Sequence, residues 1–471
     1  MFPVALNEPL YYPTPPGRSR GRPTMNRTLR LRQELHAAVR LAAPVVLVQI
    51  GLMLMGVVDA VMLGHLSKEA LAAGALGNIS TVVLLIFGGG VLAALDPLVA
   101  QAHGAGEKEA VAAHLQRGIV LALTLALPIG LLFWNVRPLL HLADQPVVIA
   151  GDAAGYARAS IWGLPAYFLF IAFRQTMQAM SVVRPTAVAI VAGNLTNVVC
   201  NWLLIYGNLG LPALGVRGSA LATSFSRWAM LVWFLWAARA QIAVYWRGFT
   251  EEAFDLARHR RLLRIGVPIG LHQAGEILFF ATLALLVGRM GVVALAGHQI
   301  AINMASLSFM VPLGIGGAAA TRVGNAIGRG DMPGARRAAA VCLALGGGTM
   351  LAFALLFAAA PAALGRIYTR DPEVIAMVTL LLPIAAAFQV FDGIQTVGGG
   401  ILRGAADTTF PAVLAVLGFW VLGLPAGLFL AYRTHLGAAG LWWGMTVGLA
   451  AVSLLLVGRI AQRFRAGIER V

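Results

Sequence analysis

Twelve long apolar runs constrain the fold more strongly than any other feature of the sequence. Each run has about 20 residues or more, the length at which an α-helix rising 1.5 Å per residue crosses roughly 30 Å of hydrocarbon. Only 11% of the 471 residues are charged, whereas a soluble domain carries about 25%. We therefore predict an all-α polytopic membrane protein whose twelve transmembrane helices lie near 41–66, 74–101, 118–141, 160–182, 186–206, 217–244, 263–288, 295–323, 338–364, 375–402, 410–432 and 437–460.

Lys and Arg residues concentrate on one side of the predicted membrane. The stretches 18–40, 247–264 and 459–470 are rich in arginine, and all three lie on the side that holds both termini. Cytoplasmic loops of membrane proteins carry an excess of Lys and Arg, so we expect both termini in the cytoplasm. The same bias accounts for the net charge of +16, and we expect no nucleic-acid partner.

The chain divides into a tail, two halves and a linker. Residues 1–38 are predicted to be a cytoplasmic tail, disordered where Pro, Gly and Arg dominate, with Met25 as a candidate true start. Residues 245–262 are predicted to be a cytoplasmic linker. Cys200 and Cys342 lie inside apolar runs, which indicates neither a disulfide framework nor a metal site.

The two halves repeat each other at a constant offset of 224 residues. Fourteen positions of the first half recur without a gap in the second: Arg40, Pro44, Leu47, Gln49, Gly51, Leu54, Ala60, Gly64, Leu71, Ala72, Gly90, Val99, Gly104 and Gly106 recur as Arg264, Pro268, Leu271, Gln273, Gly275, Leu278, Ala284, Gly288, Leu295, Ala296, Gly314, Val323, Gly328 and Gly330. Each half has six predicted spans, so both enter the membrane from the same side. We predict two parallel six-helix lobes, 39–244 and 263–471, an arrangement in which transporters bind substrate between the halves.

Three acidic residues lie well inside predicted spans: Asp59, Glu276 and Asp392. A charge in hydrocarbon costs at least about 2.5–3.5 kcal/mol on insertion scales, so each acid calls for a reason. We favour binding of a proton or Na⁺, and the alternative is a structural hydrogen bond between helices. Asn197 and Asn201 share one helix face and lie at a depth similar to that of Asp59, so they belong either to the same site or to helix packing.

Basic and imidazole side chains inside the spans have plainer interpretations. Arg174 occupies the repeat position equivalent to Asp392, and we expect it to form an ion pair or to line a cavity. Arg227 is the other main base within the spans. His272 and His298 could shuttle protons, but a lone histidine in a membrane span is more often a hydrogen-bonded packing residue, so both are left outside the site.

Several motifs together resemble those of the multidrug and toxic compound extrusion (MATE) transporters, in particular the NorM-like branch. The resemblance covers nearly everything from Arg40 to the C-terminus. The motifs are Pro44 with VDAVMLG (58–64), LAAGALGN (71–78), ALDPLVAQAHGAGE (94–107), VPIGLHQAGE (267–276), VGNAIGRGD (323–331) and FDGIQTVGGGILRGAADT (391–408).

The resemblance implies a V-shaped bundle of two lobes and assigns roles to residues of the first. Asp59 resembles the first-lobe acid that is tied to proton coupling in the family. Asn197 and Asn201 resemble the paired asparagines beside it, and Pro44 resembles the proline that bends the first helix.

For the second lobe, the resemblance implies that Glu276 and Asp392 bind the coupling cation, and both are candidate Na⁺ ligands. Some relatives have a tyrosine one turn before the tenth-span acid, where this chain has Phe388. That departure removes a hydroxyl ligand, so H⁺ and Na⁺ both remain open.

The expected function is export of small cationic or amphipathic drugs in exchange for H⁺ or Na⁺, by alternating access between the lobes. We expect a non-enzyme without cofactors, embedded in the lipid of a bacterial inner membrane and sufficient as a monomer. The alternative is a flippase of related fold that moves lipid-linked precursors. A flippase needs cavity bases to hold a diphosphate, and here the spans carry three acids.

Overall fold

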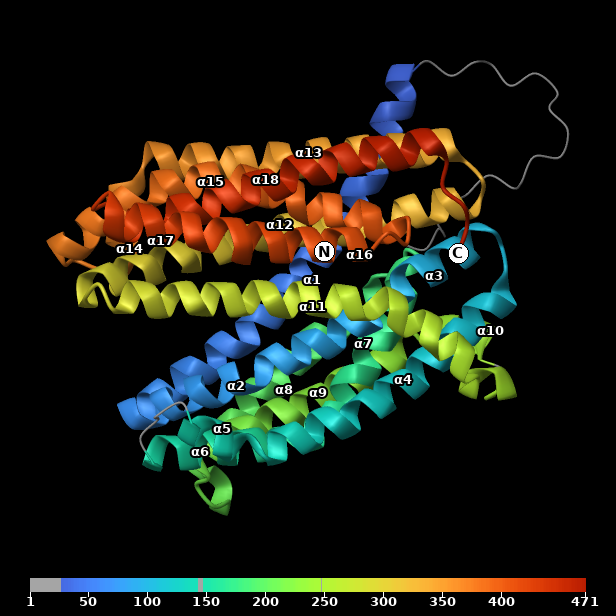
Figure 1. Cartoon of the computed structure of the whole chain (residues 1–471). Coiled ribbons are helices and arrows are strands. Elements are labelled where there is room, and N and C mark those ends of the chain that lie inside the picture. The colour runs from blue at the N-terminus through green and yellow to red at the C-terminus, as the bar shows by residue number, and fades with distance from the viewer. Residues whose placement is uncertain (1–26, 143–146, 247) are drawn as a thin grey trace, which may run out of the picture.

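The computed structural model describes residues 27–142, 147–246 and 248–471, and every regular element in these ranges is a helix (Figure 1). The first half contains α1 (Arg27–Leu66), α2 (Lys68–Leu92), α3 (Leu95–Gly104), α4 (Lys108–Trp134), α5 (Val136–Leu142), α6 (Val147–Ser160), η1 (Ile161–Gly163), α7 (Leu164–Ala179), α8 (Arg184–Tyr206), η2 (Asn208–Gly210), α9 (Gly215–Ala237) and α10 (Arg239–Tyr245). The second half contains η3 (Glu251–Phe254), α11 (Leu256–Gly288), α12 (Val292–Gly328), α13 (Met332–Ala359), α14 (Pro361–Tyr368), α15 (Pro372–Gly404), α16 (Thr409–Ala415), η4 (Val416–Gly423), α17 (Leu424–Arg433) and α18 (Gly437–Ala466).

The predicted all-helical membrane fold is confirmed, with a difference in how its spans are built. Within the described residues, 10 helices are long and apolar enough to cross a membrane. The pair of α9 and α10, which is bent by 73°, makes an eleventh when the two helices are counted as one span. The predicted span at 160–182 corresponds to η1 and α7, and α7 alone has 16 residues. The helix α7 is therefore shorter than a helix that crosses a membrane, but η1 connects it directly to the preceding helix α6.

Helix boundaries differ from the prediction on the basic side of the molecule. The helix α1 begins at Arg27, so residues 27–38 of the predicted tail are helical. The helix α11 begins at Leu256, inside the predicted linker, where Asp255 caps it by accepting hydrogen bonds from the N–H groups of Ala257 and Arg258. Residues 1–26, with Met25, and residue 247 lie outside the described residues.

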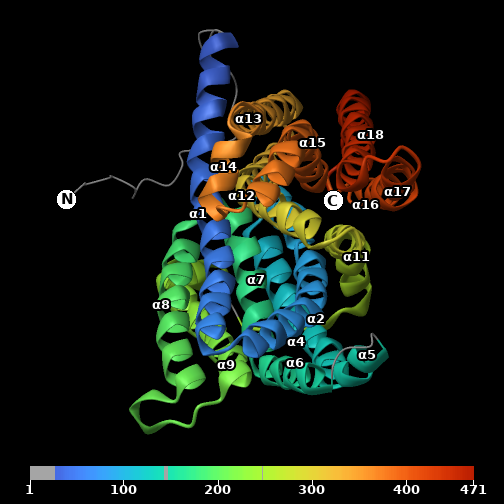
Figure 2. The same cartoon turned by 90° about the vertical axis from the view of Figure 1, so that its left-hand side faces the viewer.

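The helices form two bundles that approach each other at one end of the molecule and diverge toward the other, which gives the V shape (Figure 1). The helices α1 and α11 connect the bundles. Residues 38–42 of α1 pack into the core of the second half, and residues 262–269 of α11 pack into the core of the first. Figure 2 shows α1 running past both bundles. The first helix of each half therefore begins in the core of the other half.

Glycines allow the closest contact between the halves. A Cβ atom on Gly104 of α3 would lie 2.2 Å from the carbonyl oxygen of Asn325 in α12. A Cβ on Gly328 of α12 would lie 2.1 Å from the carbonyl oxygen of Gln101 in α3. Each glycine and each carbonyl is the repeat equivalent of the other, so this crossing of α3 and α12 lies on the axis that relates the halves. We call this the α3 end of the molecule.

The C-terminal tail closes over the α3 end. Arg470 forms an ion pair with Glu107, in the turn between α3 and α4. The N–H of Val471 donates to Oε1 of Gln101 at 2.7 Å. The hydrogen bond from Arg470 lowers the pKa of Glu107 below its usual range. The tail thus joins the second half to the first at the α3 end.

Candidate functional site

A buried carboxylate lies between three helices of the first half. The Oδ1 atom of Asp59 on α1 accepts hydrogen bonds from Asn197 at 2.9 Å and from Asn201 at 2.6 Å. Both asparagines are fully buried and lie one turn apart on α8, because residues four apart share a helix face. Asn201 also donates to Asn197 at 3.2 Å. The structure therefore brings together the three first-lobe residues singled out from the sequence.

A third donor to this carboxylate was missed by the sequence analysis. The hydroxyl of Thr223 on α9 donates to Oδ2 of Asp59 at 2.7 Å. A threonine inside an apolar run carries little signal, because its hydroxyl usually bonds to the carbonyl four residues earlier in its own helix. Three neutral donors thus surround the carboxylate of Asp59, which is 9% exposed.

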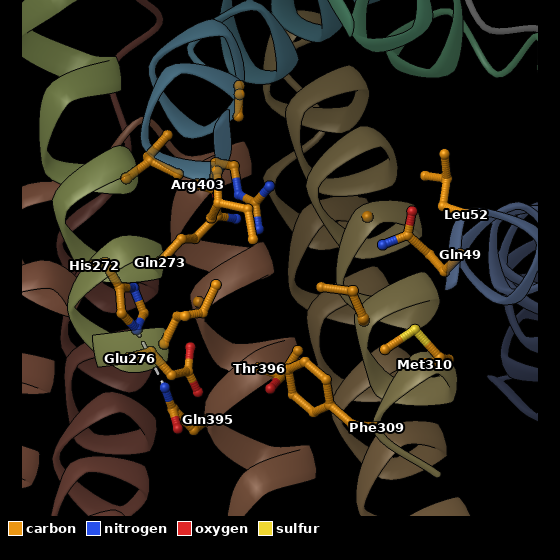
Figure 3. A pocket seen from close by; sticks show the side chains of 18 of the residues that line it. Gln49, Leu52, His272, Gln273, Glu276, Phe309, Met310, Gln395, Thr396 and Arg403 are labelled. Atoms are coloured by element: carbon orange, nitrogen blue, oxygen red, sulfur yellow. Dashed lines mark hydrogen bonds between the residues drawn. The ribbon is translucent and has the colours of Figure 1, made fainter. Parts of the chain in front are cut away.

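The second-lobe acids lie elsewhere, in the wall of a cavity of about 600 Å³ between the two halves (Figure 3). Glu276 projects from α11, and Asp392 projects from α15. Figure 3 places Gln49 of α1 on one side of this cavity and Glu276 on the other. The apolar lining consists of aromatic and aliphatic side chains, including Tyr167, Ile171, Phe280, Phe309, Met310 and Phe388. Such a surface suits a flat apolar molecule with a few polar groups.

The predicted site residues thus separate into two groups. Glu276 and Asp392 line the cavity, whereas Asp59, Asn197 and Asn201 are not among the residues that line it. Pro44 lies inside α1, which continues as a single helix from Arg27 to Leu66. Proline lacks the N–H that would bond to the carbonyl four residues earlier. Whether it bends the helix during transport stays a prediction.

Three further charged residues line the cavity near the α3 end. Asp96 of α3, 1% exposed, pairs with Arg403 of α15 at 3.2 Å. The same oxygen, Oδ2, accepts a longer bond from Gln175 at 3.4 Å. Arg174 of α7 donates to Oε1 of Gln49 at 3.1 Å. The ion pair of Asp96 and Arg403 joins the two halves at the α3 end of the cavity.

The two histidines set aside from the site take different positions. His272 lines the cavity and lies 3.2 Å from Gln395. His298 is buried and accepts a hydrogen bond from the indole of Trp442 at 3.2 Å. The second arrangement is a packing contact, and the first belongs to the cavity wall.

Carboxylates are the candidate ligands for a cation. No group of three or more His, Cys, Asp or Glu side chains suited to a metal ion occurs among the described residues. Glu276 and Asp392 supply carboxylate oxygens on one wall, and the ring of Phe388 contributes none. A Na⁺ site at this position stays a prediction, as does proton binding at Asp59.

Comparison with known proteins identifies the family. The MatE family model matches residues 44–203 and 268–429. The multidrug resistance protein MdtK of Yersinia pseudotuberculosis is 36% identical over 439 residues, which cover 91% of this chain and 95% of that protein. The MdtK protein of Edwardsiella ictaluri is 35% identical over 435 residues, with the same coverage.

Solved structures of low sequence identity share the fold. The eukaryotic MATE transporter AtDTX14 superposes with a TM-score of 0.84 at 23% identity, over 93% of this chain and 98% of that one. The Vibrio cholerae MATE transporter VcmN in the bent form gives 0.82 at 17% identity, over 93% and 98%. The matched repeats, the curated relatives and the shared architecture together show that the chain belongs to the MATE family of transporters.

Proposed function

We propose that this protein exports small cationic and amphipathic compounds in exchange for H⁺ or Na⁺, by alternating access between its two halves. The names of its relatives support multidrug resistance as the physiological role. The cavity between the halves supports the substrate class, because apolar walls with the acids Glu276 and Asp392 suit an amphipathic cation.

The observation that carries the proposal is the isolation of Asp59 from the cavity. Its carboxylate has three donors of its own within the first half and is not part of the cavity lining. An ion on Asp59 and a drug in the cavity can therefore influence each other only through the helices between them. Such an arrangement is compatible with an exchange mechanism in which the ion site and the drug site are coupled through a movement of the helices.

Protonation of Asp59 would alter the contacts of α1. A neutral carboxyl group is a weaker acceptor than a carboxylate, and charge-assisted hydrogen bonds are roughly twice as strong as neutral ones. The bonds from Asn197, Asn201 and Thr223 would weaken, which frees α1 from α8 and α9. Because the beginning of α1 packs into the second half, a change at Asp59 would reach both halves. Pro44 lies between these two regions and is the point where α1 would bend.

The second-half acids would serve the same exchange from the cavity wall. A proton or Na⁺ on Glu276 and Asp392 would neutralise the charges that attract a cationic drug, so drug and ion would compete. When the ion leaves toward the cytoplasm, the ionised carboxylates can bind another molecule of a cationic drug.

We further propose that the α3 end faces the cytoplasm and that both termini lie on that side. The excess of arginine at this end supports this orientation. The contacts between α3 and α12 then close the cytoplasmic side, so the structure corresponds to the outward-facing state in a bacterial inner membrane. One chain contains both halves, and a monomer suffices for transport. A lipid-linked precursor is disfavoured as substrate, because Arg403 is already paired with Asp96, and the acids Glu276 and Asp392 would repel a diphosphate in the same cavity.

The test replaces Asp59 by asparagine in a host that lacks its own drug exporters. Resistance to ethidium should fall to the level of cells without the protein, because asparagine keeps the size of the side chain but carries no exchangeable charge. The matched control is D152N, since Asp152 is exposed on α6, and it should keep full resistance. Retained resistance in D59N, at equal membrane expression, would contradict the role of Asp59.

A further inference from the structure

The ion pair between the two halves must break when the α3 end opens. Asp96 lies on α3 of the first half and Arg403 on α15 of the second, with 3.2 Å between Oδ2 and Nη1. Asp96 is 1% exposed, and a buried charge that loses its partner is strongly destabilising. Separation of the halves at this end therefore requires a new partner for Asp96.

One oxygen of the Asp96 carboxylate has no partner in the closed arrangement. Oδ2 accepts hydrogen bonds from Arg403 at 3.2 Å and from Gln175 of α7 at 3.4 Å. Oδ1 is buried and has no hydrogen-bond partner among the described residues. A buried acceptor without a donor costs free energy. This oxygen would therefore be stabilised by a further donor from the first half.

Arg174 of α7 has the complementary donor. It precedes Gln175, whose side chain already reaches Asp96, and it is close enough to Asp96 for an electrostatic interaction. Its Nη1 atom donates to the neutral oxygen of Gln49 at 3.1 Å. Its Nε atom is buried without a partner in the part of the chain that the structure describes. The first half thus contains an unsatisfied donor on Arg174 and an unsatisfied acceptor on Asp96.

We infer that Asp96 exchanges partners during transport: it pairs with Arg403 while the α3 end is closed and with Arg174 while that end is open. This inference rests on the proposed alternation between two arrangements of the halves. A guanidinium group can donate two parallel hydrogen bonds to one carboxylate, so the pair with Arg174 would satisfy both Oδ1 and Nε. Asp96 and Arg174 are then positioning residues that determine the relative stability of the closed and open states.

Gln49 connects this exchange to the helix that carries Asp59. Both residues lie on α1, ten positions apart, and Figure 3 shows Gln49 and Arg403 projecting from different sides of the cavity. Movement of α1 after protonation of Asp59 would take the Gln49 oxygen away from Arg174. Arg174 would then turn to Asp96, and Arg403 would lose its partner. The state of Asp59 would thus reach the α3 end through three side chains.

The experiment measures the distance between two spin labels at the α3 end of the full chain. The labels are attached to K108C on α4 and Q462C on α18, two exposed positions, after replacement of Cys200 and Cys342. The short and long distances report the closed and open populations, and their ratio is measured without a drug and without an ion gradient. The inference can therefore fail while export by the wild type stands, and the reverse.

Two substitutions should shift this ratio in opposite directions. R403Q removes the partner of the closed state, so the ratio of open to closed molecules should rise about tenfold or more, the effect of a lost bond between charged groups. R174Q added to R403Q also removes the partner of the open state, and it should lower the ratio again by about the same factor. Lysine keeps the charge without the planar fork, so R174K should lower the ratio less.

A purely structural role for Arg174 predicts a different result. If the guanidinium only held α7 against Gln49 of α1, R174Q would change the ratio equally with and without the Asp96 carboxylate. The exchange of partners predicts that R174Q has no effect once D96N is present together with R403Q. An equal effect in the two backgrounds would overturn the inference, as would a ratio in R403Q that equals that of the wild type.

The matched control is R289Q in the R403Q background. Arg289 follows the end of α11 and is exposed, so its replacement removes an arginine charge that is not part of the exchange. The ratio should remain that of R403Q alone. A fall as large as the one caused by R174Q would show that the ratio follows the net charge of the protein, which would also overturn the inference.

Discussion

At the scale of single residues, helix geometry predicted part of the first-half site. The spacing of Asn197 and Asn201 places them on one face, and counting helical rise places that face near the depth of Asp59. The structure has both asparagines bonded to Asp59. Thr223 could not be found in this way, because its role depends on how α9 packs against α1, and no spacing within α9 records that.

Thr223 provides a graded test of the Asp59 site. Replacement of Thr223 by valine removes one of the three donors and keeps the shape of the side chain. We expect the proton-driven efflux rate to fall about twofold to twelvefold, the effect of one hydrogen bond of about 0.5–1.5 kcal/mol. T223S keeps the hydroxyl and should retain most of the rate. Equal rates in T223V and the wild type would show that this bond does not contribute.

The charges in the cavity were only partly predictable. From the sequence we expected Arg174 to form an ion pair or to line a cavity, and in the structure it lines the cavity. Asp96 was not singled out from the sequence, yet it joins the halves through Arg403. Partners on distant helices are invisible in a sequence, because pairs that span hundreds of residues leave no local pattern.

At the scale of helices, apolar runs predicted the elements well and their ends poorly. Hydrophobicity marks where a helix lies in the membrane, but α1 and α11 continue beyond it into polar sequence, beginning at Arg27 and Leu256. The packing of the beginnings of α1 and α11 against the opposite half was also not predicted. The repeat establishes that α1 and α11 are equivalent, but it does not state which neighbours they have.

The crossing of α3 and α12 permits a test of the closed end. In G328A the new Cβ would lie 2.1 Å from the Gln101 carbonyl oxygen, so the helices must separate. Overpacking of this kind costs about 1–3 kcal/mol, enough to shift the population toward a state that is open at the α3 end. Spin labels on K108C and Q462C, in a background without Cys200 and Cys342, should report a longer distance in G328A.

The control for this test is G458A, because Gly458 of α18 has open space around the position of a Cβ atom. G458A should keep the distance distribution of the parent. An unchanged distribution in G328A as well would contradict the conclusion that this crossing holds the α3 end closed.

At the scale of the whole molecule, the repeat predicted two related halves with a substrate site between them. The cavity lies there, lined by both halves. The end at which the bundles meet was not predictable, because a transporter with alternating access uses one sequence for two arrangements of nearly equal stability.

The central claim is that an ion gradient drives export through Asp59, and dye efflux from proteoliposomes tests it most directly. Vesicles with ethidium receive a pH jump or a Na⁺ jump separately, with the wild type, D59N, E276Q and the control E469Q, whose position is exposed. We predict that one of the two jumps drives efflux in the wild type and in E469Q, and that neither jump drives efflux in D59N. Efflux that persists in D59N, or that is lost in E276Q but not in D59N, would contradict this account.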